Sequence, residues 1–114
     1  MRRANLLLIL VGVGVSCGCR VDEDSFAPRY ASAWCNQLER CDRGDFESTY
    51  EDMVECREDV AAVVEDVQAL FEILGCELDE RAATDEIRDL RRASCEEFHE
   101  RDWSADNDAV WDCR

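Results

Sequence analysis

The sequence predicts an all-α fold, a small three-helix disulfide-stapled bundle with an irregular C-terminal tail. Apolar residues recur every three to four positions in three successive segments, as they do on helices that bury one face. Six of the eight cysteines are spread between residues 35 and 113, and no stretch has the alternating pattern of a strand. The chain is therefore expected to be helical and cross-linked.

The composition excludes several classes of protein. The net charge is −15 and lysine is absent, and residues 20–114 contain 28 acidic residues against 11 arginines. Such a chain is a poor nucleic-acid binder, because it cannot neutralise phosphates. Residues 20–114 also contain only 24 large apolar side chains, which disfavours a large enzyme or a polytopic membrane protein. We expect a protein that is not an enzyme, has no cofactor and needs covalent support for its fold.

Residues 1–18 have the pattern of a secretory signal peptide. Arg2 and Arg3 precede an apolar stretch, residues 6–15, which small residues follow. A helix of this length rises only about 15 Å, about half the thickness of the hydrocarbon layer, so a permanent membrane span is disfavoured.

Two cysteines at the end of this leader are candidates for lipidation. A cysteine after a small residue resembles the lipobox of bacterial lipoproteins, in which that cysteine is acylated and becomes the mature N-terminus. The residues before Cys17 fit the motif better, whereas lipidation of Cys19 would leave six cysteines that can all pair. Both stay candidates, beside ordinary secretion. We expect an exported protein, in the outer membrane or periplasm as a lipoprotein and otherwise secreted.

Residues 19–27 are polar and acidic, which predicts a solvated tether before a cysteine-rich helical domain at residues 28–114. Pro28 suits the first position of a helix, and apolar residues follow it with helical spacing. The first helix is therefore predicted from Pro28 to about Arg40, with Gly44 ending the segment.

The second predicted helix has the clearest pattern in the chain. Ser48 and Glu51 make a capping-box sequence, and one apolar stripe then continues to Leu74, before Gly75. A helix of about 25 residues is about 37 Å long. We expect it to be the spine of the bundle.

The third helix is predicted to begin after the cap residue Asp79, with Ile87 and Leu90 on its apolar face. After Cys95 the periodicity fails. The sequence there predicts an irregular tail laid over the bundle, with at most one short helical turn after Ser104.

The cysteines of the domain predict disulfides rather than a zinc site, because none of them is paired at the two- to four-residue spacing of zinc ligands. A redox site is disfavoured because these cysteines form no C-x-x-C motif. The predicted disulfide cysteines are Cys35, Cys41, Cys56, Cys76, Cys95 and Cys113.

Sequence alone leaves the pairing of these cysteines open, but the expected hairpins rank the possibilities. If the first two helices fold back near residues 45 and 46, Cys35 lies opposite Cys56. If the second and third helices fold back near residue 76, Cys95 returns to the end that holds Cys41. The favoured set is Cys35–Cys56, Cys41–Cys95 and Cys76–Cys113.

Four stretches of the chain also carry a family resemblance: residues 34–42, the trio Phe46, Tyr50 and Cys56, residues 75–79 and residues 92–95. Over about Tyr30 to Cys95 the chain resembles the small cysteine-rich helical lipoproteins and secreted proteins of myxobacteria and related Gram-negative bacteria. The resemblance implies an envelope location and a helical disulfide domain, and it carries over no active-site residue.

The remaining candidate site residues lie in the tail. His99 is the only histidine, and without a nucleophile beside it a solvated or structural role is expected. Asp106, Asp108 and Asp112 are weak calcium candidates, because a calcium loop needs six to eight oxygen ligands and the pattern stops early; we therefore expect no metal.

Trp103 and Trp111 are candidates for a binding surface, because tryptophan is favoured at interfaces. The expected function is a non-catalytic, lipid-anchored envelope interaction or structural module, whose acidic surface admits a basic protein partner but no nucleic acid. The alternative is a secreted disulfide-stapled inhibitor or toxin-like effector that acts through a loop at residues 96–112.

Overall fold

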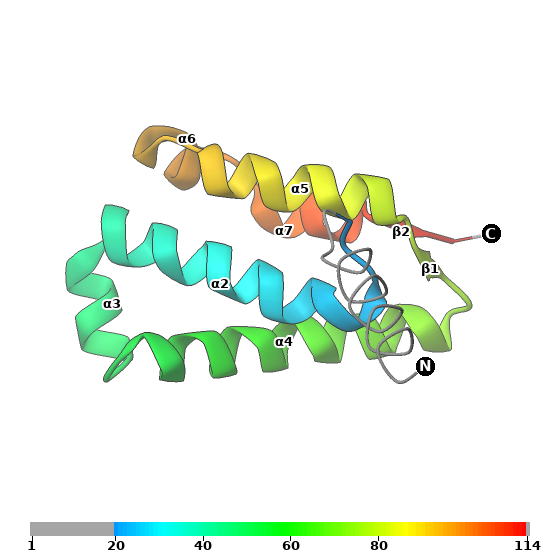
Figure 1. The fold of residues 1–114 in the computed structure, drawn as a ribbon, viewed down its shortest axis with the longest axis horizontal. Coiled ribbons are helices and arrows are strands. Elements are labelled where there is room, and N and C mark those ends of the chain that lie inside the picture. Colours follow the sequence, from blue (N-terminus) through cyan, green and yellow to red (C-terminus); the bar gives the residue numbers. More distant parts are fainter. Residues whose placement is uncertain (1–19, 114) are drawn as a thin grey trace, which may run out of the picture.

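The protein is described by a computed structural model, which covers residues 20–113. The leader, with Cys17 and Cys19, and residue 114 lie outside the described residues. The described part is dominated by helices, as predicted (Figure 1). The elements in order are α2 (Glu23–Cys41), α3 (Arg43–Thr49), α4 (Met53–Ile73), β1 (Glu77–Leu78), α5 (Glu80–Arg92), α6 (Cys95–Glu100), α7 (Trp103–Asp108) and β2 (Trp111–Asp112).

Helix α2 begins earlier than predicted, because Asp22 caps it. The Ser25 backbone N–H donates to Asp22 Oδ1 at 2.9 Å, and the Asp22 N–H donates to Ser25 Oγ at 3.1 Å, which completes a capping box. Pro28 lies inside the helix instead of starting it. Val21 and Phe26 are buried in the core, so the predicted solvated tether is wrong over residues 21–27.

The start of α4 also differs from the prediction. Ser48 lies in α3, a separate short helix that the sequence did not indicate, and Gly44 is part of it. The cap of α4 is Asp52, whose Oδ1 accepts from the Glu55 N–H at 2.9 Å. Gly75 follows the end of α4 with φ +81°, a conformation that favours glycine.

The C-terminal part is more regular than predicted. Asp79 caps α5 as expected, but the region predicted as an irregular tail contains α6 and α7, capped by Ser94 and Asp102. After α7 the chain forms β2, which pairs antiparallel with β1 so that Leu78 lies opposite Trp111.

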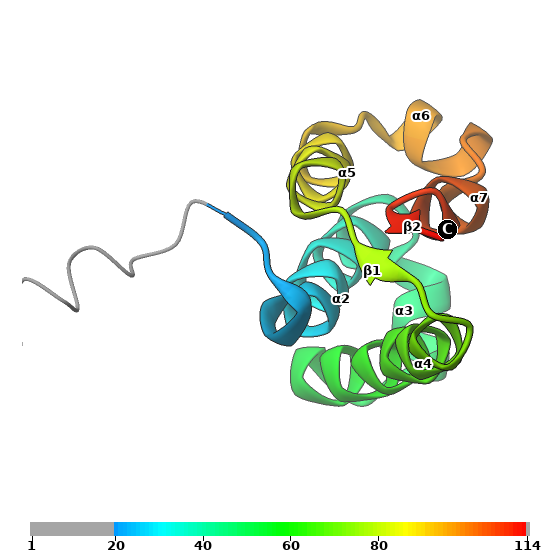
Figure 2. The same cartoon turned by 90° about the vertical axis from the view of Figure 1, so that its right-hand side faces the viewer.

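Helix α2, and not α4, is the spine of the bundle. In Figure 2, α2 lies between α4 on one side and α5, α6 and α7 on the other. Seven residues of α2 are buried, whereas on α4 only Cys56 and Val64 are buried. The predicted role of α4 is therefore wrong: it covers one side of α2 and leaves much of its own apolar surface exposed.

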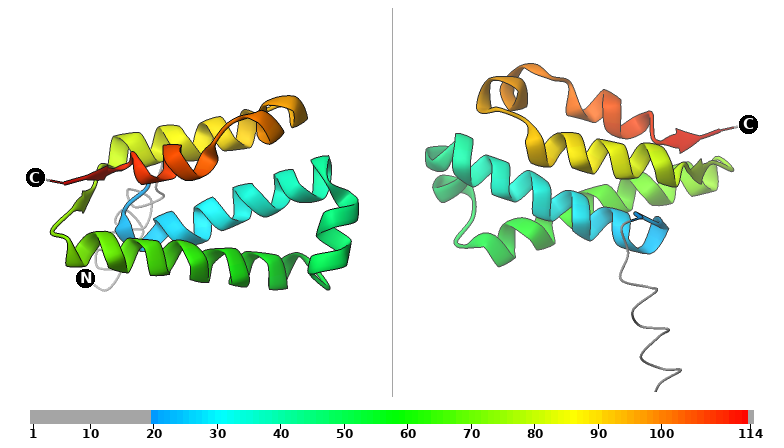
Figure 3. Two further views of the ribbon diagram at one scale, coloured as in Figure 1. Left: turned by 180° about the vertical axis from the view of Figure 1, so that it is seen from behind. Right: turned by 45° about the horizontal axis from the view of Figure 1, so that its top comes forward.

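The three disulfides have the favoured pairing of the sequence, which is confirmed. Cys35–Cys56 joins α2 to α4, Cys41–Cys95 joins α2 to α6, and Cys76–Cys113 ties the chain end to the start of β1. In Figure 3, α3 links α2 to α4 at one end of the molecule, while β1 and β2 lie at the other end. Within residues 20–113, no helix is long and apolar enough to cross a bilayer.

Candidate functional site

An open cleft lies between α4 and α7, with α2 as its floor. Its volume is about 350 Å³, within the range of small-ligand sites. Figure 2 shows α7 on one side and α4 on the other, with α2 alongside both. Most lining side chains are aromatic or aliphatic: Tyr30, Trp34, Tyr50, Asp59, Val60, Val63, Val64, Val67, Trp103, Ser104, Asn107 and Asp108.

The floor of the cleft is a rigid aromatic surface. Tyr30 and Trp34, one turn apart on α2, stack with ring centroids 6.3 Å apart, and Trp34 packs on Phe98 of α6 at 4.8 Å. Burial raises the pKa of Tyr30, and the nearby Glu86 carboxylate raises it further, so the phenol stays neutral. The floor therefore offers apolar surface without a charge.

One wall of the cleft is α7, which Arg101 fixes to α5. The Arg101 guanidinium is 3.1 Å from a Glu86 oxygen and 3.6 Å from an Asp89 oxygen, and it also binds the Asp106 carboxylate. The same guanidinium lies 4.3 Å from the centre of the Trp103 ring. This contact network positions Trp103 in the cleft.

Glu86 is the unusual member of that network. Its side chain is only 5% exposed, and its Oε2 has no hydrogen-bond partner among the described residues. Burial raises the pKa of Glu86 to about 7, although Arg101 opposes this shift. Asp106 and Asp89 raise it further.

The other wall is the valine-rich face of α4, and this wall continues beyond the cleft as exposed apolar surface. Val63 lines the cleft and is 63% exposed. Leu70 and Leu74 lie seven and eleven positions later, on the same face of the helix axis, and both are more than half exposed. Three exposed apolar side chains thus continue the valine wall along one face.

Polar groups lie at the edges of the cleft. Asp59 comes from α4 and Asp108 from α7, so a carboxylate stands on each wall. Asn107 is also in the α7 wall, and its Oδ1 is buried without a hydrogen-bond partner in residues 20–113. The cleft thus combines an apolar interior with acceptors on both walls.

The two tryptophans expected at a binding surface are buried. Trp103 is 4% exposed and donates from Nε1 to the Phe98 carbonyl at 3.0 Å. Trp111 is 7% exposed and lies against Phe26 and Phe71. Trp103 contributes to the cleft as part of its lining, whereas Trp111 belongs to the core. Neither side chain is an exposed aromatic anchor.

The three calcium candidates are not assembled into a site. Asp106 binds Arg101, Asp108 stands at the cleft edge, and Asp112 lies in β2. Among residues 20–113, no three acidic, cysteine or histidine side chains are grouped as ligands for a metal ion.

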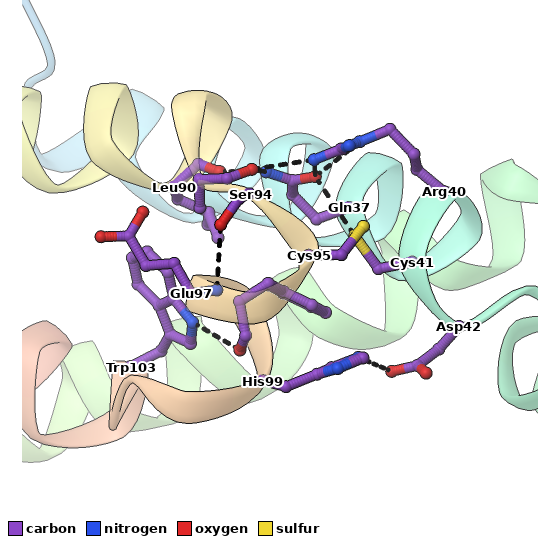
Figure 4. Close-up of a disulfide and its surroundings, with 12 residues drawn as sticks. Gln37, Arg40, Cys41, Asp42, Leu90, Ser94, Cys95, Glu97, His99 and Trp103 are labelled. Atoms are coloured by element: carbon purple, nitrogen blue, oxygen red, sulfur yellow. Dashed lines mark hydrogen bonds and ion pairs between the residues drawn. A yellow bond between two sulfur atoms is a disulfide. The ribbon is translucent and has the colours of Figure 1, made fainter.

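His99 has a structural contact. Its Nε2 lies 2.8 Å from Asp42 Oδ2, beside the Cys41–Cys95 disulfide (Figure 4). Both the disulfide and this hydrogen bond join α6 to the end of α2. His99 thus reinforces the attachment of α6, in agreement with the structural role expected for it.

Sequence reasoning missed the α4 valines as site residues, because the apolar stripe was assigned to the core. The signal that could have identified the valines is the width of the apolar stripe. A stripe wider than the contact with one neighbouring helix leaves some of its apolar residues exposed.

The three disulfides indicate an oxidising, exported environment. No family model, curated protein or solved structure matches the chain.

Proposed function

We propose that this protein is a lipid-anchored, exported interaction module, which binds a basic amphipathic helix of a partner protein in the cleft between α4 and α7. The observation that carries the proposal is the cleft itself, which has an aromatic floor, a valine wall and one carboxylate on each side. A helix that lays its apolar face into such a groove is a common mode of recognition.

Charge favours a basic partner over an acidic one. The chain has a net charge of −15, and the two carboxylates of the cleft are Asp59 and Asp108. A partner with lysine or arginine beside its apolar face would be attracted over a distance and oriented on arrival. A second copy of this chain carries the same negative charge and is repelled.

The exposed part of α4 extends the surface to the length that a helix needs. Val63 and Leu70 of α4 and Leu74, the residue that caps its C-terminal end, follow one another along one face over about three turns. A partner helix that starts in the cleft can therefore continue along this face.

The binding test uses a synthetic helix of leucine and lysine, with its leucine and glutamate counterpart as the control peptide. Val63→Asn should weaken binding of the basic peptide by about tenfold, or about 1.4 kcal/mol. Val54→Asn is the matched control, because Val54 is 58% exposed on the same helix and does not line the cleft. Equal losses in the two variants, or equal binding of the two peptides, would contradict the proposal.

The lipid anchor is proposed at Cys17 or Cys19, and it is tested separately. The intact mass of the membrane-extracted protein should include acyl chains and begin at one of these cysteines. A mature protein without acyl chains would exclude the anchor but not the cleft.

The exposed loop that suggested the inhibitor or toxin-like alternative is not found in the structure. Residues 96–112 were expected to form a loop, but most of them lie in α6, α7 and β2, with Phe98, Trp103 and Val110 buried. A disulfide-stapled inhibitor would present an exposed, extended segment, and this region is folded into the bundle.

A further inference from the structure

A second groove lies between α2 and α5 and differs in chemistry from the α4–α7 cleft. Its volume is about 340 Å³, and it shares no lining residue with the cleft. Its lining contains four arginines and no acidic residue: Val21, Arg29, Thr84, Ile87, Arg88, Arg91 and Arg92.

This concentration of arginine is unexpected in so acidic a chain. The sequence has 28 acidic residues against 13 basic ones, so a groove whose charged lining residues are all arginines is not what the composition predicts. Arg88 is partly neutralised, because it lies 3.0 Å from Asp85 and 3.9 Å from Asp89. Arg91 and Arg92 are exposed, and no carboxylate within residues 20–113 forms an ion pair with either.

Several guanidinium groups around one groove are suited to a phosphate group. Each guanidinium has a planar fork of N–H donors that matches two phosphate oxygens, and it is less strongly hydrated than an ammonium group. Thr84 also stands in the groove, where its Oγ1 accepts from the Val21 N–H at 3.0 Å. The arginines therefore provide positive charge for a phosphate group. The hydrogen bond to Thr84 holds the backbone of Val21 in place in the groove.

The groove lies where the chain enters the folded domain. Val21 lines the groove and is buried, and Figure 2 shows residues 20–22 entering α2 beside α5. Cys17 and Cys19 precede Val21 by at most four residues, a reach of about 14 Å when fully extended. An acyl chain on either cysteine, as in the proposed function, would thus hold the groove at the membrane surface.

We propose that this arginine groove binds the phosphate of an anionic lipid headgroup and thereby orients the domain on the membrane. The overall negative charge opposes this contact only weakly, since charges more than about 10 Å from the surface are screened by salt. Arginines close to the surface are attracted to anionic lipids. With the groove against the lipid, the α4–α7 cleft remains available to a protein partner.

The test uses the full exported chain with Cys17→Ser and Cys19→Ser, so that no acyl chain contributes to binding. Sedimentation with vesicles of phosphatidylglycerol and phosphatidylcholine should recover the protein, whereas vesicles of phosphatidylcholine alone should not. Arg91→Gln with Arg92→Gln should reduce partition by about tenfold. Arg43→Gln with Arg57→Gln is the matched control, because both of these arginines are exposed but lie on α3 and α4. Circular dichroism confirms that each double variant is folded.

Three outcomes would overturn the proposal: equal partition of the two double variants, equal binding to neutral vesicles, or partition that does not fall as salt is raised. A titration with inorganic phosphate distinguishes a lipid headgroup from a soluble phosphate as the ligand of the groove. If free phosphate perturbs Arg91 and Arg92 while vesicles do not bind, the ligand is a soluble phosphate and the lipid assignment is wrong. None of these outcomes depends on peptide binding at the α4–α7 cleft.

Discussion

The side-chain amide of Gln37 on α2 donates to the Leu90 carbonyl on α5 at 2.7 Å (Figure 4). The same amide nitrogen donates to the Ala93 carbonyl at 2.9 Å, and Arg40 donates to that carbonyl at 2.8 Å. Carbonyls at the end of a helix have no partner within the helix, so a neighbouring helix caps them here. Gln37 is buried, and the contact connects residues 53 positions apart in the sequence.

Replacement of Gln37 by leucine should therefore be strongly destabilising. The substitution keeps much of the volume but leaves the Leu90 carbonyl without a donor and the Ala93 carbonyl with Arg40 alone, which costs about 1–3 kcal/mol. Urea unfolding measures the change. Asn36→Leu is the control, since Asn36 is the exposed neighbour on α2 and should change the free energy of unfolding little. A Gln37 variant as stable as the control would show that water replaces the amide.

The stability of the protein should depend on pH through Glu86. Its folded-state pKa is raised from 4.5 to about 7, so folding favours the protonated form. The resulting stabilisation is complete below pH 4.5 and is lost as the pH rises through about 7. The charged groups that act on Glu86 are Arg101, Asp106 and Asp89.

Glu86→Gln removes this titration. The free energy of unfolding of the wild type should fall relative to that of the variant as the pH rises from 4.5 to about 7. Glu47→Gln, at an exposed position on α3, serves as the control and should follow the wild-type curve. Parallel curves for the wild type and Glu86→Gln would refute the assignment.

The two described glycines outside the leader should respond to alanine in opposite directions. Gly75 has φ +81°, where a side chain is strained, so Gly75→Ala should destabilise by about 1–2 kcal/mol. Gly44 lies in α3 and has open space where a Cβ would stand, so Gly44→Ala should stabilise by up to about 1 kcal/mol. Thermal unfolding of the two variants provides the comparison, and shifts of the same sign would contradict it.

Loss of the Cys41–Cys95 bridge should destabilise the domain by about 2–4 kcal/mol, because this disulfide closes the longest separation of the three, 54 residues. The measurement is urea unfolding of the Cys41→Ala, Cys95→Ala double variant. Digestion without reduction should recover the same three pairs from the exported protein. A peptide that joins Cys35 to Cys41 would be incompatible with the fold.

The helical class was predictable from the local spacing of apolar residues, and the disulfide pairing could be ranked, though not determined, from the hairpins expected between successive helices. Short connections bring successive helices back antiparallel, which places cysteines that are far apart in the sequence opposite one another. Asp79 was recognisable as a cap from the local sequence as well. Asp22 was not recognised, since the acidic residues around it were assigned to a tether and Pro28 was taken as the helix start.

The packing partners of each helix were not predictable in this way. Periodicity indicates that a helix has an apolar face, but it does not indicate whether another helix covers that face. Helix α2 is the central helix. Its buried residues include the small Ala27, Ala31 and Ala33, which allow neighbouring helices to approach it closely. Helix α4 has more large apolar residues than α2 and leaves several of them exposed, and the cleft follows from that difference. Helices α6 and α7 are too short for periodicity to detect.

The order of the disulfides also determines how the protein would respond to a pulling force. The shortest covalent path between Arg20 and Cys113 follows residues 20–35, crosses Cys35–Cys56, follows residues 56–76 and crosses Cys76–Cys113. If the N-terminal end is held by the proposed lipid anchor, a pull on the C-terminal end loads residues 23–35 of α2 and then α4. Residues 36–55 and 77–112 lie off this path, so tension reaches them only indirectly while the bridges are intact.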